Sequence, residues 1–179
     1  IIPMDYGGVS CQINEIKKIA DENDLLVIED AAEALGTSVN GIKTGNMSDL
    51  SIFSFCGNKV LTTGEGGAIT TNSKEIFERI KLLRSHGRLD TSSYFSNPSE
   101  PSYLNVGYNW RMSSITAALG ISQLGKLDKI IALRKKNAKL ITSGLSKLSS
   151  KIIFPFSSEK YENIYQMYTI RLKNKHVRD

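Results

Sequence analysis

The sequence predicts an α/β protein built on a mostly parallel sheet, and two observations support that prediction. Apolar runs at 25–28 and 50–55 are too short for helices and have the composition of strands covered on both faces, as parallel strands are. Helical spacing of apolar residues appears between and after these runs, over 13–20 and 74–84. Because strands and helices alternate as far as Arg84, we expect three layers, with helices packed against a central sheet.

The first half of the chain accounts for most of this sheet. Strands are expected at 1–4, 25–28, 50–55 and 67–71, and helical segments at 13–20, 31–36 and 74–84. Asn14 is a plausible N-cap for the first helix and Asn23 a plausible stop, while Asn72 or Ser73 begins the last. The strands are expected to be neighbours in one sheet.

The second half is expected to leave this sheet. Residues 88–105 are polar and carry Pro98 and Pro101, which predicts a long loop of a kind that is often functional. A long helical region follows over 115–145, bent near Gly120 and Gly125, and strands are expected at 152–154 and 165–172. We therefore predict three parts, which are a partial large domain (1–112), connecting helices (113–148) and the beginning of a small α+β domain (149–179).

The composition is that of an ordinary globular protein, with 40% hydrophobic and 23% charged residues. The formal net charge is +5, but the lysines are spread over helices, so no nucleic-acid partner is expected. Cys11 and Cys56 show neither metal-ligand nor disulfide spacing, so we expect no metal and a reduced, cytoplasmic compartment. No membrane span or signal peptide is expected, and the start at Ile1 suggests a piece of a longer protein.

A single lysine, Lys59, stands on the loop that follows the strand predicted at 50–55. The loop after a buried parallel strand is where α/β proteins place their chemistry. A lysine held there in a partly desolvated cleft becomes a nucleophile toward carbonyl groups. A solvated lysine on a connecting loop is the simpler explanation.

Two other polar side chains fall at the ends of neighbouring strands, Asp30 and Ser54. A carboxylate, a hydroxyl and an amine suit an anionic cofactor that carries an aldehyde and a basic ring nitrogen, and pyridoxal phosphate has these features. Each residue also has a structural explanation. Asp30 can cap the segment that follows, Ser54 can bond to backbone, and the glycines over 64–67 can simply form a tight turn.

Five motifs occur together and in order, at 29–36 (EDAAEALG), 53–59 (FSFCGNK), 62–67 (TTGEGG), 84–87 (RSHG) and 107–112 (GYNWRM). In this combination the chain resembles the DegT/StrS family of sugar-nucleotide aminotransferases, which have the fold-type I architecture. The resemblance covers nearly the whole chain. It implies that the predicted sheet is part of the large domain of that fold.

The resemblance implies roles for individual residues. Lys59 corresponds to the lysine that forms the Schiff base with pyridoxal phosphate, and Asp30 to the aspartate that pairs with the ring nitrogen. Ser54 corresponds to a serine that holds the phosphate. Asn109 corresponds to a residue that reaches the phosphate from the other subunit, which implies a homodimer with shared active sites.

The resemblance leaves two positions open. Glu33 stands where many members have glutamine or histidine near the ring oxygen of the cofactor, and a carboxylate there must be protonated or face away. His86 is a possible substrate contact, and a structural role for it is equally open. Cys56 is most simply a small core residue.

The branch of the family that the motifs resemble most is that of the perosamine synthases. The implied reaction moves an amino group from glutamate to a nucleotide-linked keto-deoxysugar, a 4-keto-6-deoxyhexose, for surface polysaccharide or glycan biosynthesis. Two alternatives stay open, which are a non-catalytic regulatory or interaction member and a sugar dehydratase relative. The dehydratases carry histidine where this chain has Lys59. Because the family's chains are longer, we expect this chain alone to have weak activity or none.

Overall fold

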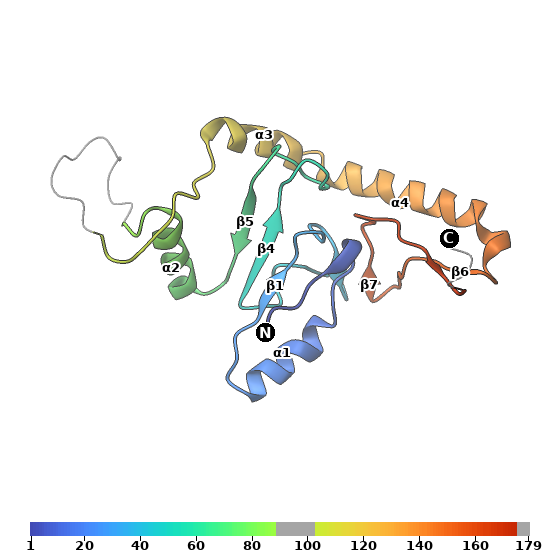
Figure 1. Ribbon diagram of the computed structural model, residues 1–179, viewed down its shortest axis with the longest axis horizontal. Helices are drawn as coiled ribbons and strands as arrows, with labels where there is room; N and C mark the ends of the chain where they lie inside the picture. The colour runs from blue at the N-terminus through green and yellow to red at the C-terminus, as the bar shows by residue number, and fades with distance from the viewer. Residues whose placement is uncertain (89–102, 175–179) are drawn as a thin grey trace.

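The computed structural model describes residues 1–88 and 103–174, so most of the loop predicted over 88–105 lies outside the described residues. Its central sheet has the order β1-β4-β5, formed by β1 (Ile28–Asp30), β4 (Leu50–Ser54) and β5 (Gly67–Thr70) (Figure 1). Strand β1 is parallel to β4, and Met4 forms a parallel bridge to Asp30. The prediction of an α/β fold with a mostly parallel sheet is confirmed.

One pairing departs from the parallel pattern, because β4 and β5 are antiparallel. The connection between them covers only residues 55–66, and parallel strands need a longer crossover, usually through a helix. The short connection therefore returns as a hairpin-like loop. That loop carries Lys59.

Helix α1 (Ile13–Glu22) ends at Asn23 as predicted, but it begins after Gln12, so Asn14 is not its cap. Its buried side is marked by Ile13 and Ala20, which pack with Val27 and Val39 in one apolar cluster. The helical segment predicted over 31–36 is wrong. That stretch forms two successive turns, in which the N–H of Ala34 donates to the carbonyl of Ala31 at 2.9 Å and the N–H of Thr37 to that of Ala34 at 3.0 Å. These bonds span three residues, whereas those of an α-helix span four.

The other helices follow the sequence closely. Helix α2 (Lys74–Arg84) is capped by Ser73, whose hydroxyl accepts a hydrogen bond of 3.3 Å from the N–H of Ile76. Helices α3 (Ser114–Leu124) and α4 (Leu127–Gly144) are separated at Gly125, as predicted, whereas Gly120 lies inside α3 without breaking it. Short 3₁₀ turns form at Tyr6–Gly8 and Ser146–Leu148.

A second small sheet has the order β3-β2-β7, formed by β2 (Ser38–Val39), β3 (Ile42–Lys43) and β7 (Tyr161–Glu162). The β2–β3 hairpin was not predicted, although Asn40-Gly41 is a strong signal for a two-residue hairpin turn. Of the strand predicted over 165–172, only β8 (Arg171–Leu172) forms, paired with β6 (Ile152–Ile153). Tyr165 has a φ of +53°, which excludes it from a regular strand.

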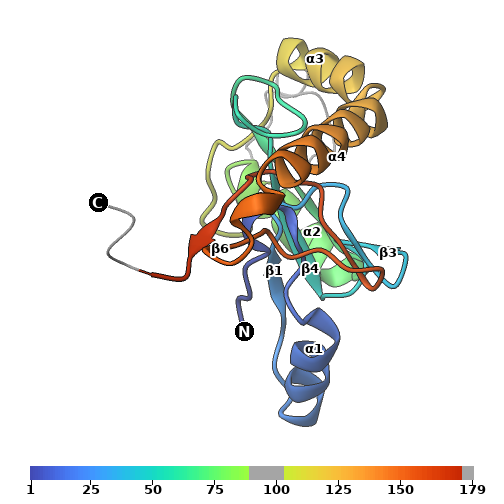
Figure 2. The same ribbon diagram turned by 90° about the vertical axis from the view of Figure 1, so that its right-hand side faces the viewer.

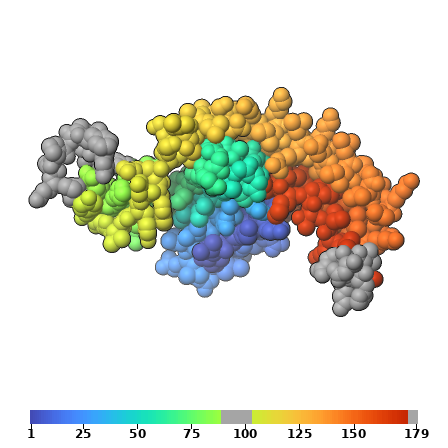
Figure 3. Space-filling view, turned by 45° about the horizontal axis from the view of Figure 1, so that its top comes forward, coloured from blue at the N-terminus to red at the C-terminus, as the bar shows by residue number. Residues whose placement is uncertain are grey.

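Helices α3 and α4 cross the end of the central sheet at which β1 and β4 finish, whereas α1 lies at the opposite end (Figures 1 and 2). The segment after α4 returns along that helix toward the middle of the molecule, where it contacts the earlier part of the chain (Figure 3). Within the described residues, no helix has both the length and the apolar character needed to cross a membrane.

Candidate active site

Two of the predicted site residues lie at one edge of the central sheet. Asp30 is the last residue of β1 and Ser54 the last of β4, and these strands are parallel neighbours with Asp30 opposite Ile52. Parallel strands end at the same edge, so both side chains belong to the carboxyl edge of the sheet, where open α/β sheets bind ligands.

Both side chains also order the turn that follows their strand. One carboxylate oxygen of Asp30 accepts a hydrogen bond of 3.1 Å from the N–H of Ala32, and the hydroxyl of Ser54 accepts one of 3.3 Å from the N–H of Cys56. The structural explanations for the two residues therefore hold in part. They do not exclude a ligand, because a carboxylate has about four acceptor positions and a hydroxyl can also donate.

The loop that carries Lys59 is anchored on the side that leads toward β5. Val60 and Leu61 are 4% and 3% exposed, and Val60 packs in a cluster with Ile131 of α4 and Ile164. The backbone N–H of Lys59 donates to the carbonyl of Cys56 at 3.0 Å. The lysine is therefore mounted on a fixed loop, and its side chain is only 14% exposed.

The amine of Lys59 faces the carboxylate of Glu33. The distance from Nζ to Oε1 is 3.7 Å, and the Glu33 side chain is 17% exposed. The other oxygen, Oε2, accepts a hydrogen bond of 2.8 Å from the backbone N–H of Gly7. Partial burial strengthens the attraction between opposite charges relative to a surface pair. Glu33 thus joins the lysine to the turn at Tyr6–Gly8.

Sequence reasoning missed Gln166. Its side-chain amide donates to the backbone carbonyl of Asn58 at 2.9 Å, next to Lys59, and its Oε1 is buried without a partner among the described residues. Arg134 holds this segment in place by donating to the carbonyls of Tyr165 and Gln166, at 3.1 Å each. No local signal reveals Gln166, because it reaches the lysine loop from 108 positions further along the chain.

His86 and Asn109 form a second group beyond the end of α2. Arg111 lies between them, with one nitrogen 3.3 Å from Nε2 of His86 and its Nε donating to Oδ1 of Asn109 at 3.3 Å. Asn109 also forms an isolated bridge to Ser85. In the described residues, the bonds of these two side chains run to their own neighbours and not to Asp30, Ser54 or Lys59.

The glycines after Lys59 are explained by backbone geometry. Gly66 has a φ of +141°, and a side chain at Gly67 would lie 2.6 Å from the carbonyl oxygen of Phe53. Only glycine fits such positions without strain. The tight-turn explanation of these glycines is therefore sufficient.

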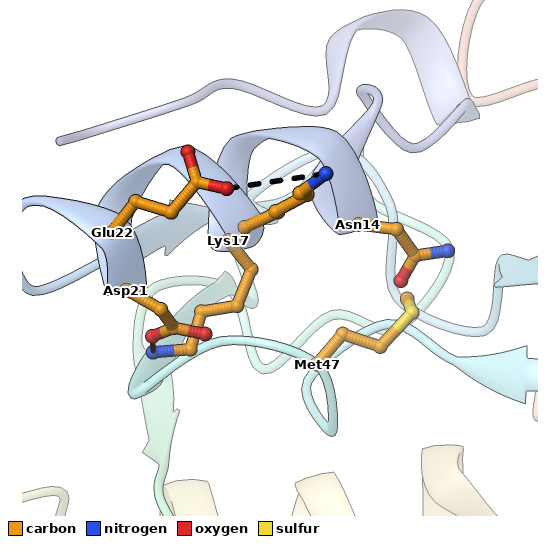
Figure 4. Close-up of a pocket in the computed structure, with 6 residues that line it drawn as sticks. Asn14, Lys17, Asp21, Glu22 and Met47 are labelled. Carbon is orange, nitrogen blue, oxygen red and sulfur yellow. Dashed lines mark hydrogen bonds and ion pairs between the residues drawn. The ribbon is translucent and has the colours of Figure 1, made fainter.

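A hollow along α1 has no comparable chemistry (Figure 4). The charged side chains that line it pair with one another, with Lys17 2.7 Å from Asp21 and Lys18 3.9 Å from Glu22. Met47 closes the other side. The group around Lys59 is thus the better candidate for an active site.

The donor set around Lys59 fits pyridoxal phosphate. A half-buried amine matches the aldehyde, a carboxylate at the end of β1 matches the ring nitrogen, and the hydroxyl of Ser54 matches the phosphate. The chain is thus an α/β protein whose candidate site is centred on a lysine.

The whole chain, residues 1–179, matches the DegT/DnrJ/EryC1/StrS aminotransferase family, and the chain belongs to it. It is 37% identical to the GDP-perosamine synthase of Caulobacter vibrioides over 172 residues, which cover 96% of this chain and 44% of that protein. It is 39% identical to the UDP-4-amino-4,6-dideoxy-N-acetyl-beta-L-altrosamine transaminase of Campylobacter jejuni, over 96% of this chain and 40% of that protein.

Solved structures agree with the sequence relatives. Helicobacter pylori PseC, an aminotransferase involved in the biosynthesis of pseudoaminic acid, matches with a TM-score of 0.88 and 31% identity over 98% of this chain and 46% of that one. The expected family and fold-type I architecture are confirmed. The chain spans less than half the length of these relatives.

Proposed function

We propose that the protein containing this chain transfers an amino group from glutamate to a nucleotide-linked keto-deoxysugar, with pyridoxal phosphate as cofactor. The observation that carries the proposal is the Lys59 amine, 14% exposed and held 3.7 Å from the Glu33 carboxylate at the carboxyl edge of the sheet. Membership of an aminotransferase family, with relatives named as sugar aminotransferases, supports the same function.

Four side chains of this chain would hold the cofactor. Lys59 would bond to its aldehyde carbon, Asp30 would keep the ring nitrogen protonated, and Ser54 would donate to the phosphate. Glu33 would lie beside the lysine, fixed by the N–H of Gly7. When bound, pyridoxal phosphate supplies the electron sink that lets an amino acid lose its α-proton.

The remaining chemistry belongs to the protein. Nζ of Lys59 would accept the α-proton of the amino donor and return a proton on the acceptor side. Glu33 would orient this amine because the N–H of Gly7 holds one carboxylate oxygen while the other oxygen faces Nζ. In the net reaction, glutamate becomes 2-oxoglutarate, and the ketone carbon of the sugar becomes an amine-bearing carbon.

A 4-keto-6-deoxyhexose is the sugar we propose. The altrosamine transaminase from Campylobacter jejuni is named for a 4-amino-4,6-dideoxy sugar, and GDP-perosamine synthases are also among the similar relatives. The proposed reaction and the name of that relative both place the amino group on carbon 4 of the sugar.

We also propose a homodimer with shared sites. Asn109 is exposed, so another subunit can reach its side chain. The neighbouring Trp110 is 68% exposed and Ile115 is 86% exposed, more apolar surface than an isolated chain usually leaves in water. Sedimentation equilibrium of the intact protein tests this, and a monomer at all concentrations would contradict it.

The amination itself is tested with ¹⁵N-labelled glutamate and a nucleotide-linked 4-keto-6-deoxyhexose. Wild-type intact protein with pyridoxal phosphate is expected to move the label onto the sugar, and Lys59→Ala to move none. Lys18→Ala, on the exposed face of α1, is the matched control and should behave as wild type. Tight cofactor binding without label transfer would favour a regulatory member of the family instead.

A further inference from the structure

Two carboxyl groups are completely buried beneath the candidate active site, those of Asp5 and Glu29. The chain around Met4 runs parallel to β1, with Met4 opposite Asp30 and the N–H of Asp5 donating to the carbonyl of Asp30 at 2.9 Å. Side chains alternate between the two faces of extended chain. Asp5 and Glu29 are therefore both expected on the face opposite Asp30.

One oxygen of each carboxyl group is well satisfied. Oε2 of Glu29 accepts hydrogen bonds from the hydroxyls of Ser51 and Ser48, at 2.6 and 3.2 Å, and from the N–H of Gly45 at 3.1 Å. Oδ1 of Asp5 accepts one from the N–H of Cys11 at 2.8 Å. The Ser51 hydroxyl and the Gly45 N–H both donate to Oε2 of Glu29, which favours Glu29 as the hydrogen-bond acceptor of the pair.

The other oxygen of each group has no donor. Oδ2 of Asp5 and Oε1 of Glu29 are buried and lack a hydrogen-bond partner in the described part of the chain. None of the ion pairs among residues 1–88 and 103–174 involves either carboxylate. Two adjacent buried anions without a cation are strongly unfavourable, whereas one proton between them turns two unsatisfied acceptors into a hydrogen bond.

The electrostatics agree with this geometry. Burial raises the pKa of Asp5 to about 6, the Glu29 carboxylate adds to that rise, and the N–H of Cys11 opposes it. The other titratable group that faces the pair is the Cys11 thiol, and burial together with Asp5 raises the pKa of Cys11 to about 12, so this thiol stays neutral.

We propose that Asp5 and Glu29 share one proton, with Asp5 donating to Glu29, and that this acid pair fastens the turn at Tyr6–Gly8 to β1. Asp5 directly precedes the turn whose Gly7 N–H holds Glu33, and Glu29 directly precedes Asp30. Loss of the proton leaves two facing anions and weakens the connection between the turn at Tyr6–Gly8 and β1. The inference concerns the fold beneath the site and does not depend on the proposed amination.

The sign of the pH dependence follows from linkage. A carboxyl group whose pKa rises from 3.8 to about 6 on folding binds its proton more tightly in the folded state, so the protein loses stability as the pH rises through this window. Between about pH 5 and about pH 7.5, this group alone is expected to raise the unfolding equilibrium constant about tenfold.

The test is the unfolding equilibrium constant of wild type and Asp5→Asn in urea across this pH range. The asparagine amide can donate to Glu29 without a titratable proton, so the wild-type constant divided by that of the variant should rise about tenfold with pH. Asp49→Asn is the matched control. Burial opposes ionisation of Asp49, but hydrogen bonds from Val27 and Lys17 leave the pKa of that carboxyl below its usual range, so its ratio should stay flat above pH 5.

Glu29→Gln provides a second variant, because its amide can donate to Asp5 in the reverse direction. The infrared difference spectrum of wild type minus Asp5→Asn should show the band of one protonated carboxylic acid, which fades as the pH rises through about 6, the pKa of Asp5. In Glu29→Gln the Asp5 band should fade at a lower pH, because the Glu29 carboxylate no longer adds to the rise in the pKa of Asp5. A flat ratio for Asp5→Asn, or a difference spectrum without that band, would overturn the proposal. If neither variant folds, the pH dependence of the band in wild type decides alone.

Discussion

The loop around Lys59 and the stretch over 103–124 are both apolar in sequence, but the structure treats them differently. Val60 and Leu61, next to the lysine, are almost fully buried, and Val60 packs with Ile131 and Ile164 from the second half of the chain. Helix α3 has no buried residue, and Ile115 within it is 86% exposed. One region finds its partners within the described residues, and the other presents its apolar side chains to water.

Apolar residues therefore have different roles in the two regions. Around Lys59 they fix the loop that carries the amine for which we propose a catalytic role, and such a group needs rigid support. Over 103–124 the apolar side chains stay exposed, and we propose that they contact another protein surface. The same region carries Asn109, for which we propose a role in the site of a second subunit.

The largest expected effect comes from the apolar cluster of Val60, Ile131 and Ile164, which supports the loop that carries Lys59. Ile164→Ala removes a fully buried side chain from the cluster with Val60 and Ile131, and large-to-small changes of this type cost about 2–5 kcal/mol of unfolding free energy. Urea denaturation measures the loss. Affinity for pyridoxal phosphate should fall with it, because the loop that carries Lys59 loses its support.

Ile19→Ala is the matched control, since it removes the same atoms from a 54% exposed position on α1, outside the surface that we propose for the subunit contact. Its effect on the unfolding free energy of the subunit is expected to stay within about 0.5 kcal/mol, as for surface substitutions in general. Equal losses of unfolding free energy in the two variants would contradict the distinction between the buried cluster that supports Lys59 and an exposed surface.

A smaller effect is expected at the rim of the lysine region, where Glu162 joins β7 to β2 and α4. Burial by itself raises the pKa of Glu162, but hydrogen bonds from Lys135 and Ser38 outweigh burial and lower it to about 2. Its contribution to stability is therefore present above the usual pKa of 4.5 and lost as the pH falls toward 2.

Glu162→Gln should cost about 1 kcal/mol or less at pH 7, because the side chain is one-third exposed and solvent screens the pair. Thermal unfolding at pH 7 and pH 3 measures the difference, which should shrink at the lower pH. The exposed Glu159→Gln is the control. A cost that grows on acidification would contradict the assigned pairing.

The sequence was sufficient for those features that depend on local pattern. The α/β class, α2 with its Ser73 cap, the break at Gly125 and the placement of Asp30 and Ser54 at strand ends all follow from periodicity and capping rules. Turn rules of the same local kind could also have predicted the hairpin at Asn40-Gly41, which the sequence analysis did not include.

The contacts that complete the candidate site could not be predicted from the sequence. Glu33 approaches Lys59 from the turns that 31–36 forms in place of the predicted helix, and Gln166 reaches the loop from a distant segment held by Arg134. Both depend on tertiary packing, which overrides local preference and leaves no periodic signal. The predicted division into domains and the roles of Lys59, Asp30, Glu33, Ser54, Asn109 and His86 remain predictions.

The central claim is that Lys59 is the amine to which the cofactor becomes attached. The most direct measurement is to mix the intact protein with pyridoxal phosphate, reduce it with borohydride and map the modified lysine by mass spectrometry. Stoichiometric modification confined to the peptide that contains Lys59, absent from Lys59→Ala, is the result that we predict. Modification spread over exposed lysines such as Lys18, and unchanged in Lys59→Ala, would contradict it.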